Sequence, residues 1–197
     1  MSVDLLKEQL RRARVIKKGD YRYILNAITE QEPALEPTIL DDCAGKLLEK
    51  LNYKNATKIL TAESMGIPIS TAISLKTSLP LIIATKRKKG TIDEISVDYI
   101  CGYENGILHI NSIRNEEKIL IIDDLISTGG TIFSMIEGIK KAGAKIEDIG
   151  AIFNKVDYGG MRELRRMGFQ PKVLLDVKLN GNKVEVEDVI NEVNIKI

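Results

Sequence analysis

The fold is decided by the stretch Ile119-Leu120-Ile121-Ile122-Asp123-Asp124-Leu125-Ile126-Ser127-Thr128-Gly129-Gly130-Thr131. Its four leading apolar residues indicate a strand that is buried on both faces, as in the middle of a parallel sheet. Two acids stand where this strand would end. A turn rich in glycine and hydroxyl groups follows, and apolar residues at helical spacing then run up to Gly143. The order is therefore strand, acidic pair, turn and helix.

The turn has the composition of an anion-binding site. Gly129 and Gly130 permit positive φ and a close approach of backbone N–H groups to a ligand, and a helix start adds unpaired N–H groups. A phosphate would be repelled by Asp123 and Asp124, so these acids must face neutral hydroxyl groups or a metal. A sugar phosphate supplies both. The alternative is an acid pair that caps the helix, beside an ordinary glycine turn.

This segment resembles the phosphoribosyl-pyrophosphate (PRPP) motif of type I phosphoribosyltransferases, in which apolar residues and two acids precede Thr-Gly-Gly-Thr. The resemblance implies an α/β fold with a central parallel sheet of about five strands flanked by helices, a small N-terminal hood and a flexible β-hairpin flap. It also implies that Asp123 and Asp124 are catalytic and hold the ribose hydroxyls, directly or through Mg²⁺. The residues that would bind the 5-phosphate are Ser127, Thr128, Gly129, Gly130 and Thr131.

Length and composition fit one domain. We expect a hood at residues 1–35, an α/β core at 36–178 and a C-terminal edge at 179–197. The net charge of +1 argues against a broad attraction to nucleic acid or membrane. No stretch has the apolar length of a signal or a membrane span, which predicts a cytoplasmic protein. Cys43 and Cys101 are isolated, so neither a disulfide framework nor a metal site is expected from them.

Periodicity places the remaining elements. It predicts helices over residues 2–13, 37–51, 158–167 and from the turn after residue 66 to 75, and strands over 58–62, 81–84, 146–153 and 173–177. Alternation over 91–111 predicts a β-hairpin, which corresponds to the flap of the family. The sole histidine, His109, is expected to be a surface residue of this hairpin rather than a catalytic one.

Two segments are candidates for binding the leaving pyrophosphate. The turn after the 58–62 strand resembles the family's pyrophosphate loop and contains Glu63, Ser64, Met65 and Gly66. The 81–84 strand is followed by a basic run, of which Lys86, Arg87 and Lys88 would face phosphate at the carboxyl end of the sheet. In some members of the family the equivalent stretch acts across a dimer interface, and we expect a homodimer. The alternative for the basic run is a solvated face.

The acceptor substrate is predicted from two residues. Leu25-Asn26 resembles a dipeptide in the hood of bacterial xanthine enzymes, and an Asn amide can both donate to and accept from a purine edge; its alternative role is to close a turn. Lys155 follows a strand beside the PRPP strand, as in enzymes that use 6-oxopurines, where it donates to the oxygen at position 6; alternatively it is a surface lysine. Asn154 departs from the family's usual Glu.

The sequence thus predicts a magnesium-dependent purine phosphoribosyltransferase that converts PRPP and a free 6-oxopurine (hypoxanthine, guanine or xanthine) to a nucleotide and pyrophosphate. No direct protein ligand of the metal is identified beyond the candidates Asp123 and Asp124. Two rival hypotheses are an adenine phosphoribosyltransferase and a PRPP-sensing regulator of the same fold without catalysis.

Overall fold

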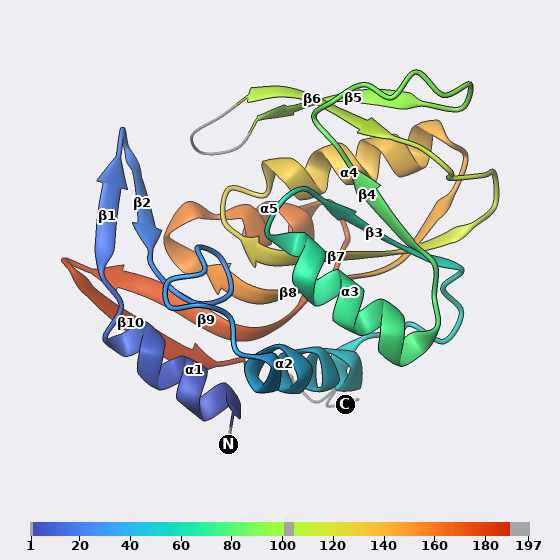
Figure 1. The fold of residues 1–197 in the computed structure, drawn as a ribbon. Coiled ribbons are helices and arrows are strands. Elements are labelled where there is room, and N and C mark those ends of the chain that lie inside the picture. Colours follow the sequence, from blue (N-terminus) through green and yellow to red (C-terminus); the bar gives the residue numbers. More distant parts are fainter. Residues whose placement is uncertain (1, 101–104, 190–197) are drawn as a thin grey trace, which may run out of the picture.

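A six-stranded sheet forms the centre of the computed structural model, which describes residues 2–100 and 105–189. The strand order is β10-β9-β8-β7-β3-β4 (Figure 1). All neighbours are parallel except β10, which is antiparallel to β9 at the edge. The strands are β3 (Lys58–Ala62), β4 (Leu81–Ala84), β7 (Lys118–Ile126), β8 (Lys145–Lys155), β9 (Lys172–Asn180) and β10 (Lys183–Asp188). The five parallel strands confirm the predicted architecture.

The opening stretch is the buried centre of this sheet. In β7, Ile119 and Ile121 belong to one core, while Leu120 and Ile122 belong to a second core on the opposite face. Alternating side chains of a strand point to opposite faces, so an uninterrupted apolar run is required here. The first core contains α4 (Gly130–Lys141) and α5 (Gly160–Arg166), and the second contains α1 (Ser2–Arg11), α2 (Pro37–Lys50) and α3 (Gly66–Thr77).

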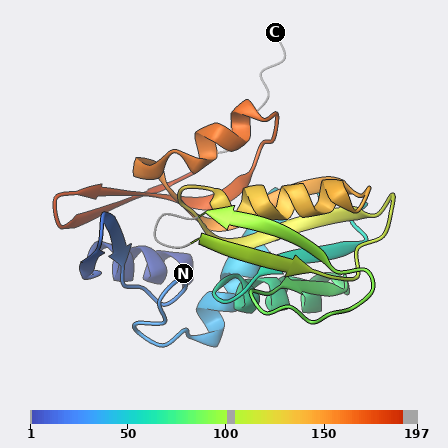
Figure 2. The same ribbon diagram turned by 90° about the horizontal axis from the view of Figure 1, so that it is seen from above.

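The predicted hood contains a β-hairpin. Strands β1 (Val15–Lys18) and β2 (Tyr21–Ile24) pair antiparallel, and Gly19 provides the positive φ (+61°) of the turn. The hairpin lies beside the β9–β10 end of the sheet (Figure 2), where the Arg22 guanidinium donates to the carbonyl oxygen of Gly181. This contact joins residues far apart in the chain, which local sequence cannot predict.

The predicted flap is also a hairpin. Strands β5 (Ile95–Ile100) and β6 (Asn105–Ile110) pair antiparallel and lie over α4 (Figure 1), where Ser134 Oγ donates to the Asp98 carbonyl oxygen at 2.8 Å. The backbone groups of His109 and Thr85 pair in both directions, which joins β6 to the end of β4. The turn of the hairpin, with Cys101, falls outside the described residues, as does the chain beyond 189.

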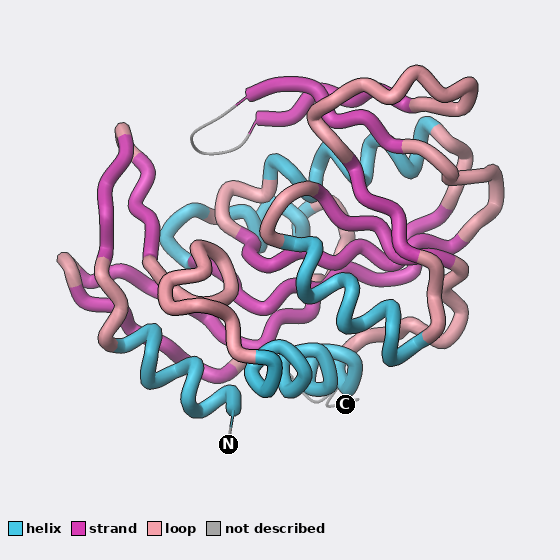
Figure 3. Tube along the Cα trace, in the orientation of Figure 1, coloured by secondary structure: helices cyan, strands magenta, loops and turns pink. Residues whose placement is uncertain are grey.

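Loops gather at one edge of the sheet. Figure 3 shows that the loops after β2, β3 and β7 converge there. The carboxyl ends of the parallel strands lie at this edge, which is where open α/β sheets bind ligands. Of the described helices, none is long and apolar enough to cross a membrane.

The docking of α1 on the sheet can be tested with two neighbouring leucines. Leu6 is 0% exposed in the core and Leu5 is 45% exposed. We expect Leu6→Ala to lower the free energy of unfolding by about 2 to 5 kcal/mol because it leaves a cavity. Leu5→Ala should change it by less than about 0.5 kcal/mol. Urea unfolding of both variants measures the difference, and equal losses would show that α1 is not docked by its Leu6 face.

Candidate active site

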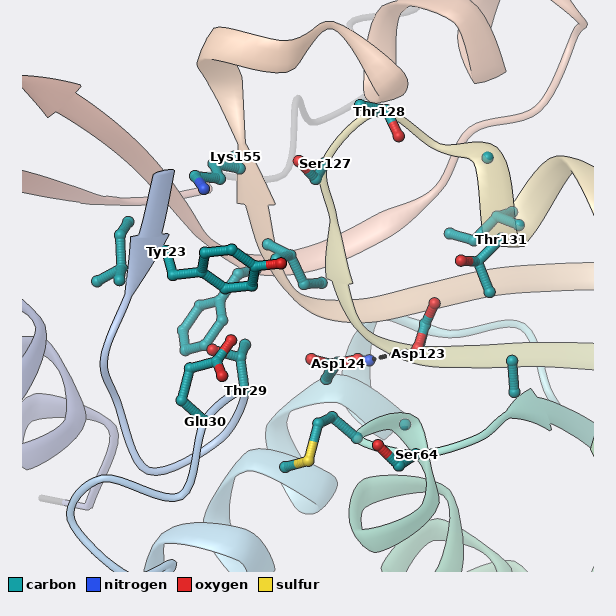
Figure 4. Close-up of a pocket in the computed structure, with 18 of the residues that line it drawn as sticks. Tyr23, Thr29, Glu30, Ser64, Asp123, Asp124, Ser127, Thr128, Thr131 and Lys155 are labelled. Carbon is teal, nitrogen blue, oxygen red and sulfur yellow. Dashed lines mark hydrogen bonds between the residues drawn. The ribbon is translucent and has the colours of Figure 1, made fainter. Parts of the chain in front are cut away.

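One cavity brings together the segments that the sequence singled out. Its wall comes from the hood, from the loops after β3, β4 and β7, and from the ends of β8 and β9 (Figure 4). The lining includes all the predicted site residues except Arg87 and Lys88: Asn26, Glu63, Ser64, Met65, Gly66, Lys86, Asp123, Asp124, Ser127, Thr128, Gly129, Gly130, Thr131 and Lys155.

The phosphate loop is shaped by close backbone packing. Gly129 has φ +86° and precedes α4, whose start has no side-chain cap. Gly160 lies against this loop: its N–H donates to the Ser127 carbonyl oxygen at 2.9 Å, and a Cβ at Gly160 would lie 2.4 Å from that oxygen. A side chain at either glycine is therefore excluded. The N–H groups at the start of α4 are left for an anion.

In the acid pair, Asp123 is buried and Asp124 is half-buried. Asp123 is 6% exposed, and its Oδ1 accepts from the Asp124 N–H at 3.0 Å. Within the described residues, no basic side chain forms an ion pair with either carboxylate. Burial raises the pKa of Asp123 to about 6, and burial together with the charge of Asp123 raises the pKa of Asp124 well above its usual value. Such a pair is stabilised by hydrogen-bond donors or a cation that a ligand brings.

The turn after β3 lies directly against the acid pair. A Cβ at Gly66 would lie 2.4 Å from Thr61 Oγ1 and 2.7 Å from Asp123 Oδ1, so only glycine allows this approach. Helix α3 begins here, also without a side-chain cap. The Glu63 carboxylate accepts from the Lys86 backbone N–H and so fixes the start of the basic run.

The basic run enters the cavity at one residue. Lys86 lines the cavity, with its Nζ 5.8 Å from the centroid of the Tyr99 ring. Arg87 and Lys88 are exposed and do not contribute to the lining. The structure therefore brings one of the three predicted cations into the cavity, and the roles of all three stay predictions.

Asn26 is one of the two predicted base-binding residues, and all hydrogen bonds of its side-chain amide are made within the hood. Its Nδ2 donates to the Ile24 carbonyl oxygen (2.8 Å) and to Thr29 Oγ1 (2.7 Å), and its Oδ1 accepts from the N–H groups of Ile28 and Thr29. These bonds use both donors and both acceptor positions of the side chain. The arrangement is the turn-closing alternative.

Lys155 is buried rather than on the surface. The residue is 2% exposed; its Nζ donates to the Arg22 carbonyl oxygen and lies 4.1 Å and 4.6 Å from the ring centroids of Tyr21 and Tyr158. Burial lowers its pKa to about 8. The surface alternative for Lys155 is therefore wrong, and its ammonium group lies in the cavity wall.

The cavity is also lined by four aromatic or polar hood residues that the sequence did not single out: Tyr21, Tyr23, Thr29 and Glu30. Figure 4 shows Tyr23, Thr29 and Glu30 across the cavity from Asp124 and Ser127. Burial, followed by the charge of Asp124, raises the pKa of Glu30. The alternation of Tyr21 and Tyr23 in a short strand was the available signal, since it places both rings on one face.

The expectation of a surface position for His109 was wrong. His109 lies on the predicted hairpin strand but is 7% exposed, and its Nδ1 is 3.0 Å from Ser96 Oγ and 3.4 Å from Glu94 Oε1. It is buried because β6 pairs with Thr85 at the end of β4 as well as with β5. His109 is not part of the cavity lining.

The oxygen-rich site suits Mg²⁺ in combination with a phosphorylated substrate. Within residues 2–100 and 105–189, no three His, Cys, Asp or Glu side chains gather into a metal-binding group. Mg²⁺ is commonly held by one or two carboxylates together with substrate phosphates. The buried, uncompensated carboxylates of Asp123 and Asp124 fit that requirement.

Comparisons with known proteins agree with this geometry. Residues 33–184 match the model of the phosphoribosyl transferase domain family. A hypoxanthine/guanine phosphoribosyltransferase from Aciduliprofundum boonei is 38% identical over 93% of this chain and 99% of that protein, and one from Methanocaldococcus infernus is 38% identical over 92% and 99%.

Solved structures share the fold. An adenine phosphoribosyltransferase from Rhodothermus marinus superposes with a TM-score of 0.73, at 18% identity over 89% of this chain and 98% of that chain. One from Thermoanaerobacter pseudethanolicus gives a TM-score of 0.72, at 18% identity over 88% and 99%. At this identity the likeness concerns the fold alone. The family match and the relatives together show that the chain belongs to the phosphoribosyltransferase family.

Proposed function

We propose that the protein is a magnesium-dependent purine phosphoribosyltransferase that uses PRPP and a 6-oxopurine. The observation that supports this most directly is the placement of a buried acid pair and a glycine-rich helix start in one cavity. A sugar phosphate satisfies both, because its phosphate accepts from N–H groups and its hydroxyls donate to carboxylates. The printed names of the relatives favour hypoxanthine and guanine as acceptors.

The cavity divides the donor substrate among its segments. Asp123 and Asp124 hold the ribose hydroxyls, directly or through Mg²⁺, and the loop Ser127 to Thr131 binds the 5-phosphate. The turn before α3 and Lys86 receive the pyrophosphate. Mg²⁺ bound with PRPP would neutralise charge on the departing pyrophosphate. A cytoplasmic location and a homodimer stay predictions from the sequence.

The reaction requires mainly positioning. The bond from ribose C1 to the pyrophosphate oxygen breaks and its electron pair leaves with pyrophosphate. A base nitrogen forms the new bond to C1, and the proton of the purine imidazole ring is released to solvent. Holding C1 between the base side and the pyrophosphate side lowers the barrier by orientation. The unpaired N–H groups at α3 and the Lys86 ammonium stabilise the charge that develops on the leaving group.

The acceptor is tested by incubating the purified protein with PRPP, Mg²⁺ and hypoxanthine, guanine, xanthine or adenine in turn. We expect nucleotide from 6-oxopurines because the Lys155 ammonium donates to an acceptor at position 6, whereas adenine has an amino donor there. Chromatography of the nucleotide products measures the preference. Product from adenine alone would overturn the role of Lys155, and no product from any base would favour the regulatory alternative.

The acid pair is tested by Asp124→Asn. We expect turnover to fall by about 100-fold or more, because a charge aimed at the reacting sugar is lost, while the protein stays folded. The matched control is Asp41→Asn on α2, which removes only an ion pair with Lys76 (2.7 Å) and should leave turnover unchanged. Steady-state kinetics with PRPP in excess makes the comparison, and unchanged turnover of Asp124→Asn would mean that the acid pair is misassigned.

The same substitution should affect stability in the opposite direction. The unfolded chain loses the Asp123 proton near pH 3.8, whereas the folded chain keeps it until about pH 6, so the folded state binds more protons between these values. This contribution to the free energy of unfolding therefore falls as pH rises through the window. The pKa of Asp124 is raised too.

Without ligands, Asp124→Asn should thus be more stable than the parent at pH 7.5. The advantage should shrink at pH 4.5, where the parent carboxyls are protonated. Urea unfolding at both values measures it. An advantage that does not depend on pH would show that the pair is not held in its protonated form by burial.

A further inference from the structure

A hydroxyl–hydroxyl contact joins the hood to the loop from Ser127 to Thr131. The Tyr21 hydroxyl donates to Ser127 Oγ at 3.0 Å, across 106 positions of sequence, and Tyr21 is 5% exposed. Ser127 is the first residue of the loop that we assign to the 5-phosphate. A contact from the hood therefore reaches the phosphate half of the cavity.

The direction of this hydrogen bond matters. Burial raises the pKa of Tyr21, so its hydroxyl stays protonated and acts as the donor. Ser127 Oγ then accepts, and its own O–H can be donated to a phosphate oxygen. Hydrogen bonds arranged in such a chain polarise one another. A phosphate oxygen that accepts a hydrogen bond from Ser127 therefore strengthens the hydrogen bond that Tyr21 donates to Ser127.

The same tyrosine is held on its other side by the base half of the cavity. The Lys155 ammonium lies 4.1 Å from the Tyr21 ring centroid and donates to the carbonyl oxygen of Arg22, the next residue of β2. The Arg22 N–H in turn donates to the Tyr158 hydroxyl at 3.0 Å, and the Tyr21 and Tyr158 rings are 4.8 Å apart. Tyr21 thus contacts Ser127 on the phosphate side and Lys155 on the base side.

We propose that Tyr21 is a positioning residue that couples occupation of the phosphate loop to binding of the base. A phosphate on Ser127 fixes Tyr21, and Tyr21 fixes the β2 strand and the Lys155 ammonium that face the base. The coupling is reciprocal, so each ligand raises the affinity for the other by the same factor. The inference rests on the proposed function, because it takes the two ligands to be a sugar phosphate and a purine.

The coupling is measured by calorimetry with ribose 5-phosphate and guanine as probes. The quantity is the ratio of the guanine dissociation constants without and with saturating ribose 5-phosphate. We expect a ratio well above one in the parent and a ratio about 3- to 10-fold smaller in Tyr21→Phe, which corresponds to one net hydrogen bond. Tyr53→Phe, a half-buried tyrosine outside the cavity lining, is the matched control and should keep the parent ratio.

Ser127→Ala tests the contact from the other side, and thermal unfolding of each variant monitors the fold. If the two hydroxyls act as one unit, Tyr21→Phe added to Ser127→Ala should lower the ratio no further. Additive losses would contradict the chain of hydrogen bonds. The Ser127 variant also keeps the proposal testable should Tyr21→Phe fail to fold.

The outcomes separate this inference from the proposed function. Absence of purine nucleotide from the parent enzyme with PRPP and Mg²⁺ would reject the function itself. A parent that makes nucleotide but has a ratio of one would overturn the coupling alone. The same holds if Tyr21→Phe weakens each ligand separately and leaves the ratio unchanged, because Tyr21 would then only contribute to the shape of the cavity.

Discussion

The structure depends on two carboxylates near the carboxyl end of its central strand, β7. Asp123 and Asp124 sit where β7 leaves the doubly covered part of the sheet, and the described residues supply no cation to pair with them. Burying acids in this way destabilises the ligand-free fold, and proteins keep such strain where it serves binding. The ribose hydroxyls and the Mg²⁺ of the proposed substrate complex supply the missing partners. The acid pair thus lowers the stability of the ligand-free protein and raises its affinity for the proposed substrate.

The remainder of the site is arranged by how closely backbone can approach these acids. Gly66 brings the start of α3 against Asp123, and Gly160 supports the phosphate loop from behind. A Cβ at either position would overlap a neighbouring oxygen. Both uncapped helix starts, of α3 and α4, therefore point their N–H groups at one cavity, with the acid pair between them. In the proposed complex, the pyrophosphate and the 5-phosphate of PRPP accept from the N–H groups at these two helix starts, and the ribose lies at the acid pair.

The features that depend on neighbouring residues could be predicted from the sequence. The apolar run of β7, the acid pair and the glycine turn each follow from residues within a dozen positions, and they were placed correctly. The burial of His109 depends on the pairing of β6 with Thr85, which lies 24 positions earlier in the chain. The same is true of Tyr21, whose partner Ser127 is 106 residues away. The sequence of a basic run is the same whether its side chains face solvent or a ligand. Only the structure shows that Lys86 lines the cavity and that Arg87 and Lys88 do not.

The contact of Lys155 with the hood gives a physical reason for choosing a 6-oxopurine. In the ligand-free protein the ammonium donates to the Arg22 carbonyl oxygen, and its pKa of about 8 leaves it mostly protonated near neutral pH. The oxygen at position 6 of hypoxanthine or guanine is the same kind of acceptor as a backbone carbonyl. An incoming 6-oxopurine can therefore replace or share that bond at small cost in free energy. In the proposed function adenine gains no such bond, because its amino group at position 6 is a donor and the Lys155 ammonium has no acceptor to offer it.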